Sequence, residues 1–87
     1  MPDAFIWYHA DEKLEPKLIE WLDEAEEHAG VRGNLFVRKG NEQTTFMETY
    51  SDVTSATIKR IERLASGNPL FANIERRCES FQRVDKL

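Results

Sequence analysis

A glutamate placed between two aromatic residues is the feature of this sequence best suited to chemistry. Glu48 alternates with Phe46 and Tyr50 in the run 44–50, which is rich in β-favouring residues. Because side chains alternate along a strand, these three share one face. Burial between aromatics disfavours a charged carboxylate, so Glu48 could act as a general base. Tyr50 could donate a hydrogen bond to a substrate oxygen, or it could simply fill an interface.

The segment before this strand is predicted to form a hairpin with it. Residues 34–39 have strand character, and residues 40–43 supply a turn. If the aliphatic side chains of residues 34–39 face the helices together with Met47, then Arg38 and Glu48 lie on the opposite face as cross-strand neighbours. An ordinary ion pair between these two residues is therefore the alternative to a catalytic Glu48.

Further side chains are candidates for a site on the same face. His9 ends the first predicted strand, where it is either an acid–base group or an exposed strand end. Arg38 and Arg77 could hold an anionic substrate, although Arg77 could instead pair with Glu79 or with a partner subunit. Cys78 has the opposite parity and is predicted to be a buried, inert thiol. The predicted catalytic residues are Glu48, Tyr50 and His9. The predicted ligand-binding residues are Trp7, Arg38, Phe46, Arg77 and Glu79.

Two helices must position these strands. Residues 15–28 carry apolar side chains at every third or fourth position, which predicts an amphipathic helix. Pro16 suits the first turn of this helix, and Gly30 suits its C-terminal cap. A second helix is predicted to follow the polar group 51–55 and to end at the Gly-Asn-Pro break 67–69.

The order of all the predicted elements indicates one fold. Strands are predicted from composition and alternation at residues 4–9, 34–39, 44–50 and 74–81. With the two helices, the order is strand, helix, strand, strand, helix, strand. We therefore predict a single ferredoxin-like α+β domain over residues 1–87, with both helices on one face of a four-stranded antiparallel sheet.

Sorting the strands by parity predicts what each sheet face carries. The set assigned to the helix-covered face is aliphatic in character: Ile6, Tyr8, Leu35, Val37 and Met47. The set assigned to the open face mixes aromatics with ionisable groups: Phe5, Trp7, His9, Phe36, Arg38, Phe46, Glu48, Tyr50, Arg77, Glu79 and Phe81. A second copy could close such a face, which predicts a homodimeric α+β barrel around a cavity for a small molecule.

Composition limits the partners. The chain has 87 residues, a net charge of −4 and one cysteine, so an internal disulfide is excluded. Residues 11–28 carry eight acidic residues against two lysines, and this acidic surface would repel a phosphate backbone. The apolar run 4–8 is shorter than the roughly 20 residues that span a membrane. We predict a cytoplasmic protein that binds neither nucleic acid nor membrane.

No cofactor motif is found, and the histidines and the cysteine lack metal-ligand spacing, so neither a cofactor nor a metal is predicted. The element order is also that of RNA-binding RRM domains. However, the Lys39-Gly40 pair lies in a turn and is not followed by the aromatic pattern of an RNP1 motif. RNA binding is therefore not predicted.

The run 45–53, Thr-Phe-Met-Glu-Thr-Tyr-Ser-Asp-Val, resembles the T-W-M-E-x-Y-x-x-V signature of a small bacterial family known as domain of unknown function 4936. The aromatic run 5–8, the basic end of the strand 35–39 and the Glu-Ser-Phe at 79–81 agree with that family. Phe46 stands where the family tends to have Trp, and Cys78 where it commonly has His. The resemblance implies a ferredoxin-like domain of the dimeric α+β barrel group, which includes cofactor-free monooxygenases, muconolactone isomerases and stress-responsive barrel proteins.

Three functions stay open on these grounds. The first is a homodimer that binds a small aromatic or hydrophobic ligand on its sheet face. The second is a purely structural or partner-binding dimer without a ligand. The third is a cofactor-free enzyme of the monooxygenase or isomerase type, in which Glu48 or His9 would move a proton, Tyr50 would donate to an oxyanion and Arg38 would orient the substrate.

Overall fold

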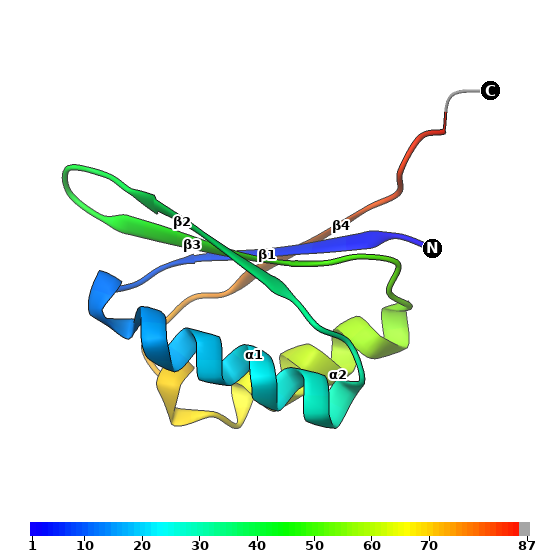
Figure 1. The fold of residues 1–87 in the computed structure, drawn as a ribbon, viewed down its shortest axis with the longest axis horizontal. Coiled ribbons are helices and arrows are strands. Elements are labelled where there is room, and N and C mark those ends of the chain that lie inside the picture. Colours follow the sequence, from blue (N-terminus) through cyan, green and yellow to red (C-terminus); the bar gives the residue numbers. More distant parts are fainter. Residues whose placement is uncertain (86–87) are drawn as a thin grey trace.

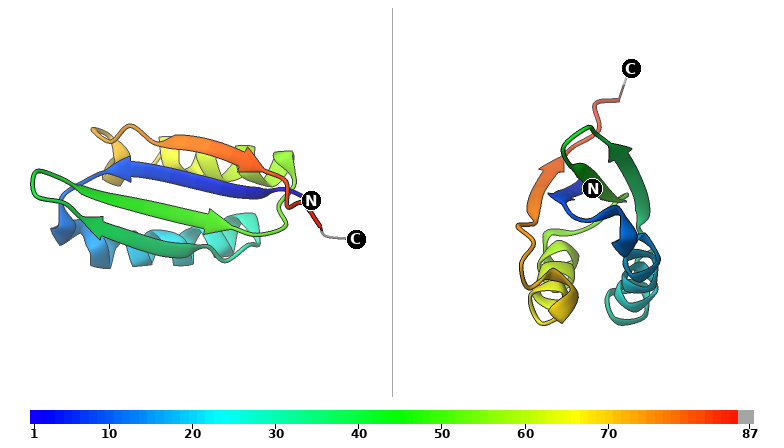
Figure 2. Two further views of the ribbon diagram at one scale, coloured as in Figure 1. Left: turned by 90° about the horizontal axis from the view of Figure 1, so that it is seen from above. Right: turned by 90° about the vertical axis from the view of Figure 1, so that its left-hand side faces the viewer.

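A computed structural model describes residues 1–85 and has the predicted order of elements. The strands and helices are β1 (Asp3–His9), α1 (Glu15–Ala29), β2 (Asn34–Lys39), β3 (Thr44–Tyr50), α2 (Ser55–Ser66) and β4 (Arg77–Phe81), with 3₁₀ turns η1 (Glu12–Leu14) and η2 (Pro69–Phe71). The four strands form one antiparallel sheet in the order β2-β3-β1-β4. Both helices cover the same side of this sheet (Figure 1, Figure 2). The predicted ferredoxin-like α+β fold is confirmed.

The helices begin and end where their local sequence requires. Pro16 lies in the first turn of α1, and Gly30 caps its C-terminus with a left-handed φ of 76° that suits a residue without a Cβ. Thr54 caps α2 by accepting a hydrogen bond from the backbone N–H of Thr57 at 3.1 Å. In α1 the side chains that face the sheet are buried, and they are Leu18, Trp21, Leu22 and Ala25.

The predicted faces of β3 are wrong: the strand is turned the other way. Phe46, Glu48 and Tyr50 have no exposed surface and lie under the helices, whereas Met47 belongs to the open face. The register with β1 explains this, because Glu48 is paired with Ile6, and directly paired residues share a face. The core between two helices and a small sheet is thereby filled with large rings.

The hairpin of β2 and β3 forms as predicted, but its register differs from the prediction. Arg38 is paired with Thr45, and Leu35 is paired with Glu48. Arg38 and Glu48 therefore lie on opposite faces, and the predicted contact between them is wrong. Leu35 is partly buried against the core, as its predicted face requires.

The last strand begins later than predicted, at Arg77 instead of residue 74. The turn η2 continues beyond its last residue, because the N–H of Ile74 donates to the carbonyl of Phe71 at 3.1 Å. Cys78 is paired with Ile6 and so has the predicted helix-side parity, but it is exposed. The predicted burial of its thiol is wrong because β4 is an edge strand, all of whose residues are exposed.

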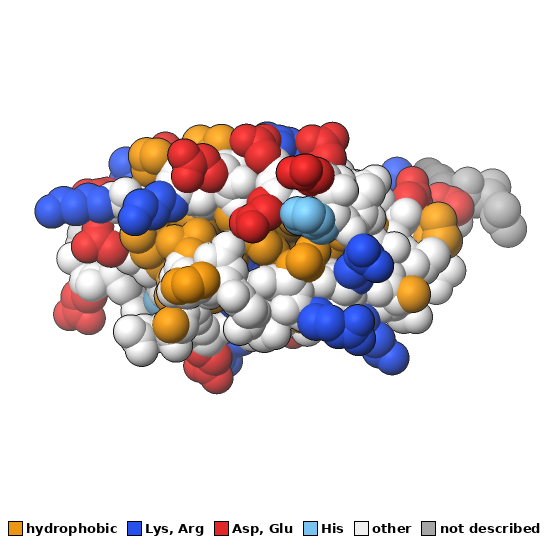
Figure 3. Space-filling model, turned by 90° about the horizontal axis from the view of Figure 1, so that it is seen from below, with side chains coloured by type: hydrophobic (Ala, Val, Ile, Leu, Met, Phe, Trp, Pro, Cys, Tyr) orange, Lys and Arg blue, Asp and Glu red, His pale blue; other side chains and the backbone are white. Residues whose placement is uncertain are grey.

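The helix-covered face carries the acidic surface that was predicted for α1. Figure 3 shows this face, with Asp and Glu side chains gathered along one side of it. The exposed acidic residues of α1 include Glu20, Asp23, Glu24, Glu26 and Glu27.

Gly33 generates a test of how tightly the core is packed. A Cβ at this position would lie 2.6 Å from Cε1 of Tyr50 and 3.1 Å from Cδ2 of Leu22, and the Tyr50 ring is completely buried. We expect Gly33→Ala to lower the free energy of unfolding in urea by about 1–3 kcal/mol through overpacking. Gly67→Ala is the matched control, because the nearest atom to its Cβ would be 3.8 Å away. Equal urea midpoints for the two variants would contradict the packing described here.

Candidate functional site

The Glu48 carboxylate is the centre of a buried hydrogen-bond network that links distant parts of the chain. Its Oε1 accepts from Trp21 Nε1 at 3.0 Å and from the Tyr50 hydroxyl at 2.8 Å. Its Oε2 accepts from the Tyr8 hydroxyl at 2.6 Å. The network thus joins α1, β3 and β1 at a side chain that has no exposed surface.

Arg76 completes this network just before β4. Its Nη1 and Nη2 donate to the two Glu48 oxygens at 2.7 and 3.2 Å, a bidentate arrangement. Nη2 also donates to Glu62 of α2 at 2.8 Å. The guanidinium lies 4.4 Å from the centre of the Phe71 ring, which adds a cation–π contact. Only 6% of the Arg76 side chain is exposed. The hydrogen bonds to Glu48 and Arg76 therefore bring together five parts of the chain at a buried ion pair: α1, α2, β1, β3 and the segment before β4.

Burial and the Glu48 charge set the protonation of the neighbouring groups. Burial raises the pKa of Tyr8 far above its usual value, and the charge of Glu48 and the hydrogen bond to it act in the same direction. The same causes in the same order raise the pKa of Tyr50. For Arg76, burial lowers the pKa, but hydrogen bonds and attraction to Glu48 and Glu62 outweigh it, so the pKa rises. The guanidinium is charged and the phenols are protonated at neutral pH.

This geometry supports a structural role for Glu48 better than the predicted catalytic one. Its two oxygens accept five hydrogen bonds and have no contact with solvent, so neither is free to take a proton from a substrate. Tyr50 donates its only proton to Glu48. Among the described residues, no buried side-chain nitrogen or oxygen lacks a partner. The network is complete without a ligand.

Four members of the network were missed by the sequence prediction: Tyr8, Trp21, Glu62 and Arg76. A signal for two of them was present. Tyr8 was assigned to the helix-covered face, and Trp21 is one of the apolar side chains of the amphipathic helix predicted over residues 15–28. A buried hydroxyl or indole N–H requires an acceptor. Arg76 lay within the strand predicted over residues 74–81, but strand alternation does not predict that an arginine is buried against a carboxylate. The structure places Arg76 just before β4.

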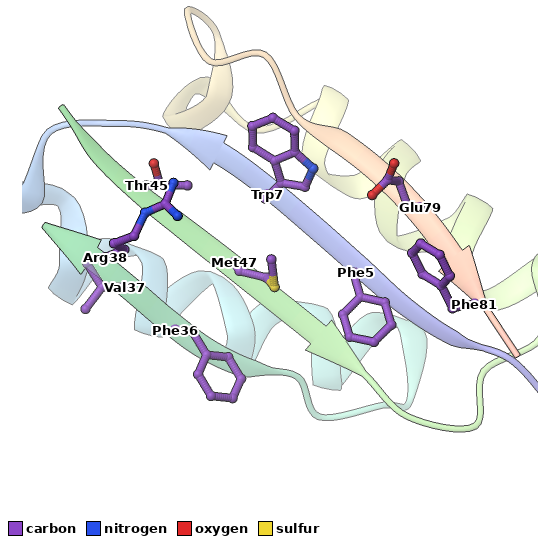
Figure 4. Close-up of a pocket in the computed structure, with 9 residues that line it drawn as sticks. All are labelled: Phe5, Trp7, Phe36, Val37, Arg38, Thr45, Met47, Glu79 and Phe81. Carbon is purple, nitrogen blue, oxygen red and sulfur yellow. The ribbon is translucent and has the colours of Figure 1, made fainter. Parts of the chain in front are cut away.

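The open face of the sheet holds a second candidate site, a broad groove of about 720 Å³. Figure 4 shows the residues that line it, which come from all four strands: Phe5, Trp7, Phe36, Val37, Arg38, Thr45, Met47, Glu79 and Phe81. Val37 is paired with the buried Phe46, so it lines only the β2 edge of the groove. Phe36 and Phe81 remain 58% and 57% exposed, although large aromatic side chains gain most from burial. The groove is mainly apolar, with one basic and one acidic side chain.

The structure divides the predicted ligand-binding residues between the groove and the core. Trp7, Arg38 and Glu79 line the groove, and Arg77 lies beside it with its guanidinium 4.9 Å from the centre of the Trp7 ring. Phe46 is in the core instead, because β3 is turned the other way.

The three predicted catalytic residues are also separated. Glu48 and Tyr50 lie in the core, whereas His9 is exposed at the end of β1. The His9 Nδ1 lies 3.0 Å from the hydroxyl of Thr45, within hydrogen-bonding distance. Thus the structure does not bring His9 together with Glu48 and Tyr50.

Within residues 1–85, no three His, Cys, Asp or Glu side chains are placed to hold a metal ion together. Over the same range, no helix has the length and apolar character needed to cross a membrane.

Comparison with solved structures supports the fold. A de novo designed protein, Foldit4, matches with a TM-score of 0.75 and 20% sequence identity, over 95% of this chain and 98% of that chain. A putative PII-like signalling protein from Thermus thermophilus matches with a TM-score of 0.52 and 22% identity, over 92% and 86% of the two chains. At these identities, the likeness shows the fold alone. No protein-family model and no curated protein matches the chain.

The network generates a prediction about alkaline pH. Tyr8 and Tyr50 are the two tyrosines of the sequence, and both have raised pKa values in the folded state. In the unfolded chain they ionise near pH 10, so the stability that they contribute is present below about pH 10 and is lost as the pH rises above it. We expect the free energy of unfolding to fall by about 1.4 kcal/mol per pH unit for each tyrosine.

Urea unfolding at several pH values measures this slope, and Tyr8→Phe should remove about half of the tyrosine contribution. Tyrosinate absorbance in the ultraviolet is a second measurement, because in the folded protein it should appear only as the chain unfolds. Tyrosinate that forms near pH 10 while the circular dichroism remains native would contradict the network.

Proposed function

We propose that the protein is a homodimer that binds a small aromatic or hydrophobic ligand on the open face of its sheet. The observation that carries this proposal is the concentration of large apolar side chains on that face. Phe5, Trp7, Phe36, Met47 and Phe81 line one groove, and they come from all four strands. Exposed apolar surface of this extent is typical of a binding surface.

A second copy provides the other half of the proposed site. Ligand sites usually enclose most of a small molecule, whereas the groove of one subunit has a single wall formed by the sheet. Two copies that face each other would cover the exposed Phe36 and Phe81 rings and would leave a closed space between the sheets. The alternative is a dimer without a ligand, in which the side chains of the two open faces pack against each other and leave no space between the sheets.

The groove supports binding more than acid–base chemistry. Its only acidic side chain within the described residues is Glu79, which is on an exposed edge strand, and His9 lies beyond its apolar part. An enzyme of the monooxygenase or isomerase type would have to use these two residues, since Glu48 and Tyr50 are occupied in the core. We therefore rank catalysis below binding.

The resemblance to family 4936 forms part of the proposal. Glu48 and Tyr50, which belong to the shared T-x-M-E-x-Y pattern, are hydrogen-bonded to each other in the core. We propose that this pattern reflects the requirements of the core network, and that the family shares the fold. The single cysteine and the exposed position of its thiol agree with the predicted cytoplasmic location.

A charged substitution on the open face tests the proposal. Phe36→Glu should weaken the dimer at least about tenfold in sedimentation velocity, because a carboxylate would be buried at the interface. Ile19→Glu is the matched control: Ile19 is 46% exposed on α1, which covers the opposite face of the sheet.

Both variants should keep the circular dichroism of the parent protein, since neither side chain is buried in the core. A wild-type protein that sediments as a monomer at micromolar concentration would overturn the dimer. A dimer that is weakened equally by both substitutions would place its interface elsewhere.

A further inference from the structure

The open face is polar at one end and apolar in the middle, as its strand register shows. Arg38 of β2 is paired with Thr45 of β3, and Thr45 is paired with His9 of β1, which makes one polar row across three strands. Two residues further along, the equivalent row is Phe36, Met47 and Trp7. The two rows are about 6.8 Å apart along the strands. A polar row that contains Arg38 therefore borders an apolar row on the same face.

Arg38 differs from Arg76 and Arg77 in having no acidic partner within residues 1–85. Arg76 pairs with Glu48 and Glu62, and Arg77 pairs with Glu75 at 3.1 Å. Arg38 is exposed and lines the groove next to Thr45 (Figure 4). An unpaired guanidinium at the edge of an apolar surface can bind a carboxylate through two parallel hydrogen bonds.

We propose that the ligand is a monocarboxylic acid with an apolar, preferably aromatic, body. Its carboxylate binds the Arg38 guanidinium, and its body lies on the apolar row of Phe36, Met47 and Trp7. This assignment rests on the proposed function, because it names the class of ligand that the open face takes.

The charges around the groove favour a single negative charge at this end. The next basic residue along β2, Lys39, has the opposite parity and is paired with Glu12 at 3.6 Å. Asp11, Glu12 and Glu42 lie around the hairpin end of the sheet and would repel a phosphate with two charges. Arg77, which lies beside the groove over the Trp7 ring, is already paired with Glu75 at 3.1 Å. The one unpaired guanidinium of the groove within residues 1–85, that of Arg38, therefore suits a carboxylate.

Glu79 gives the ligand a direction. Glu79 of β4 is paired with Phe5, and Phe5 is paired with Thr49 of β3. Arg38 is paired with Thr45, four residues earlier on β3. These two rows are about 14 Å apart along the strands. The two charges thus occupy opposite ends of the groove, so a carboxylate is attracted at the Arg38 end and repelled at the Glu79 end.

Two probes of the same shape and different charge test this assignment. We would titrate the protein, residues 1–87, with 2-naphthoic acid and with the neutral 2-naphthalenemethanol by isothermal calorimetry. The acid should bind about tenfold more tightly than the alcohol, as expected for a charge-assisted bidentate hydrogen bond at an exposed site. Arg38→Gln should lower the affinity for the acid about tenfold and should leave the affinity for the alcohol within about twofold.

Lys39→Gln is the matched control. It removes the same charge from the neighbouring position of the same strand, but Lys39 points to the other side and is paired with Glu12. The acid should keep its preference in this variant. Equal losses in Arg38→Gln and Lys39→Gln would mean that only the overall charge matters, and they would overturn the assignment of Arg38.

The outcomes separate this proposal from the one on which it rests. If wild-type protein binds acid and alcohol equally, or if Arg38→Gln keeps the preference, the ligand class is wrong, but binding on the open face stands. If Phe36→Glu binds the alcohol as tightly as wild type does, the proposed function is overturned, since binding then occurs elsewhere. If neither probe binds wild-type protein, both proposals are overturned.

Discussion

The buried ion pair between Glu48 and Arg76 is the interaction on which the rest of this structure depends. A carboxylate without solvent contact is costly unless it is paired and fully hydrogen-bonded. Here five hydrogen bonds satisfy it, and they come from β1, α1, β3 and the segment before β4. Each of these elements must therefore take the position at which its donor reaches Glu48. The pair thereby favours one register of β3. A shift of β3 by one residue would move Glu48 to the open face and leave the charge of Arg76 in the core without this partner.

The position of Glu48 decides what the open face of the sheet carries. With Phe46, Glu48 and Tyr50 in the core, β3 presents Thr45 and Met47 to the open face. The groove is consequently lined mainly by apolar side chains, with Arg38 and Glu79 as its charged groups, and its carboxylate is not next to an aromatic hydroxyl. Such a surface can select a ligand by shape and charge, but it has little means of moving protons. For this reason we propose binding ahead of catalysis. The fold analogues, at 20% and 22% identity, do not decide between these functions, because one fold can host many functions.

The sequence predicted the order of elements well, because each helix has apolar periodicity and caps, and each strand is bounded by turn residues. The faces of β3 were not predictable in the same way. Both parities of the run 44–50 contain residues that can be buried, and the presence of Glu48 among the aromatics argued for the exposed side. What reversed the assignment was the pairing with Ile6, together with donors from Tyr8 and Trp21 that approach from other elements. Burial of an acid depends on long-range partners. Arg76, its charged partner, lies just before β4, and the prediction of a strand over residues 74–81 gave no reason to pair it with Glu48.

A double-mutant cycle measures the central interaction most directly. Urea unfolding would be measured for the single variants Glu48→Gln and Arg76→Gln and for the double variant. The change in the free energy of unfolding of the double variant is then compared with the sum of the two single changes. The account predicts that each single substitution lowers the free energy of unfolding by about 3–5 kcal/mol and that the double substitution costs much less than the sum, since it leaves no unpaired buried charge. A coupling free energy below about 0.5 kcal/mol, within the range of independent sites, would contradict the claim that this pair organises the fold.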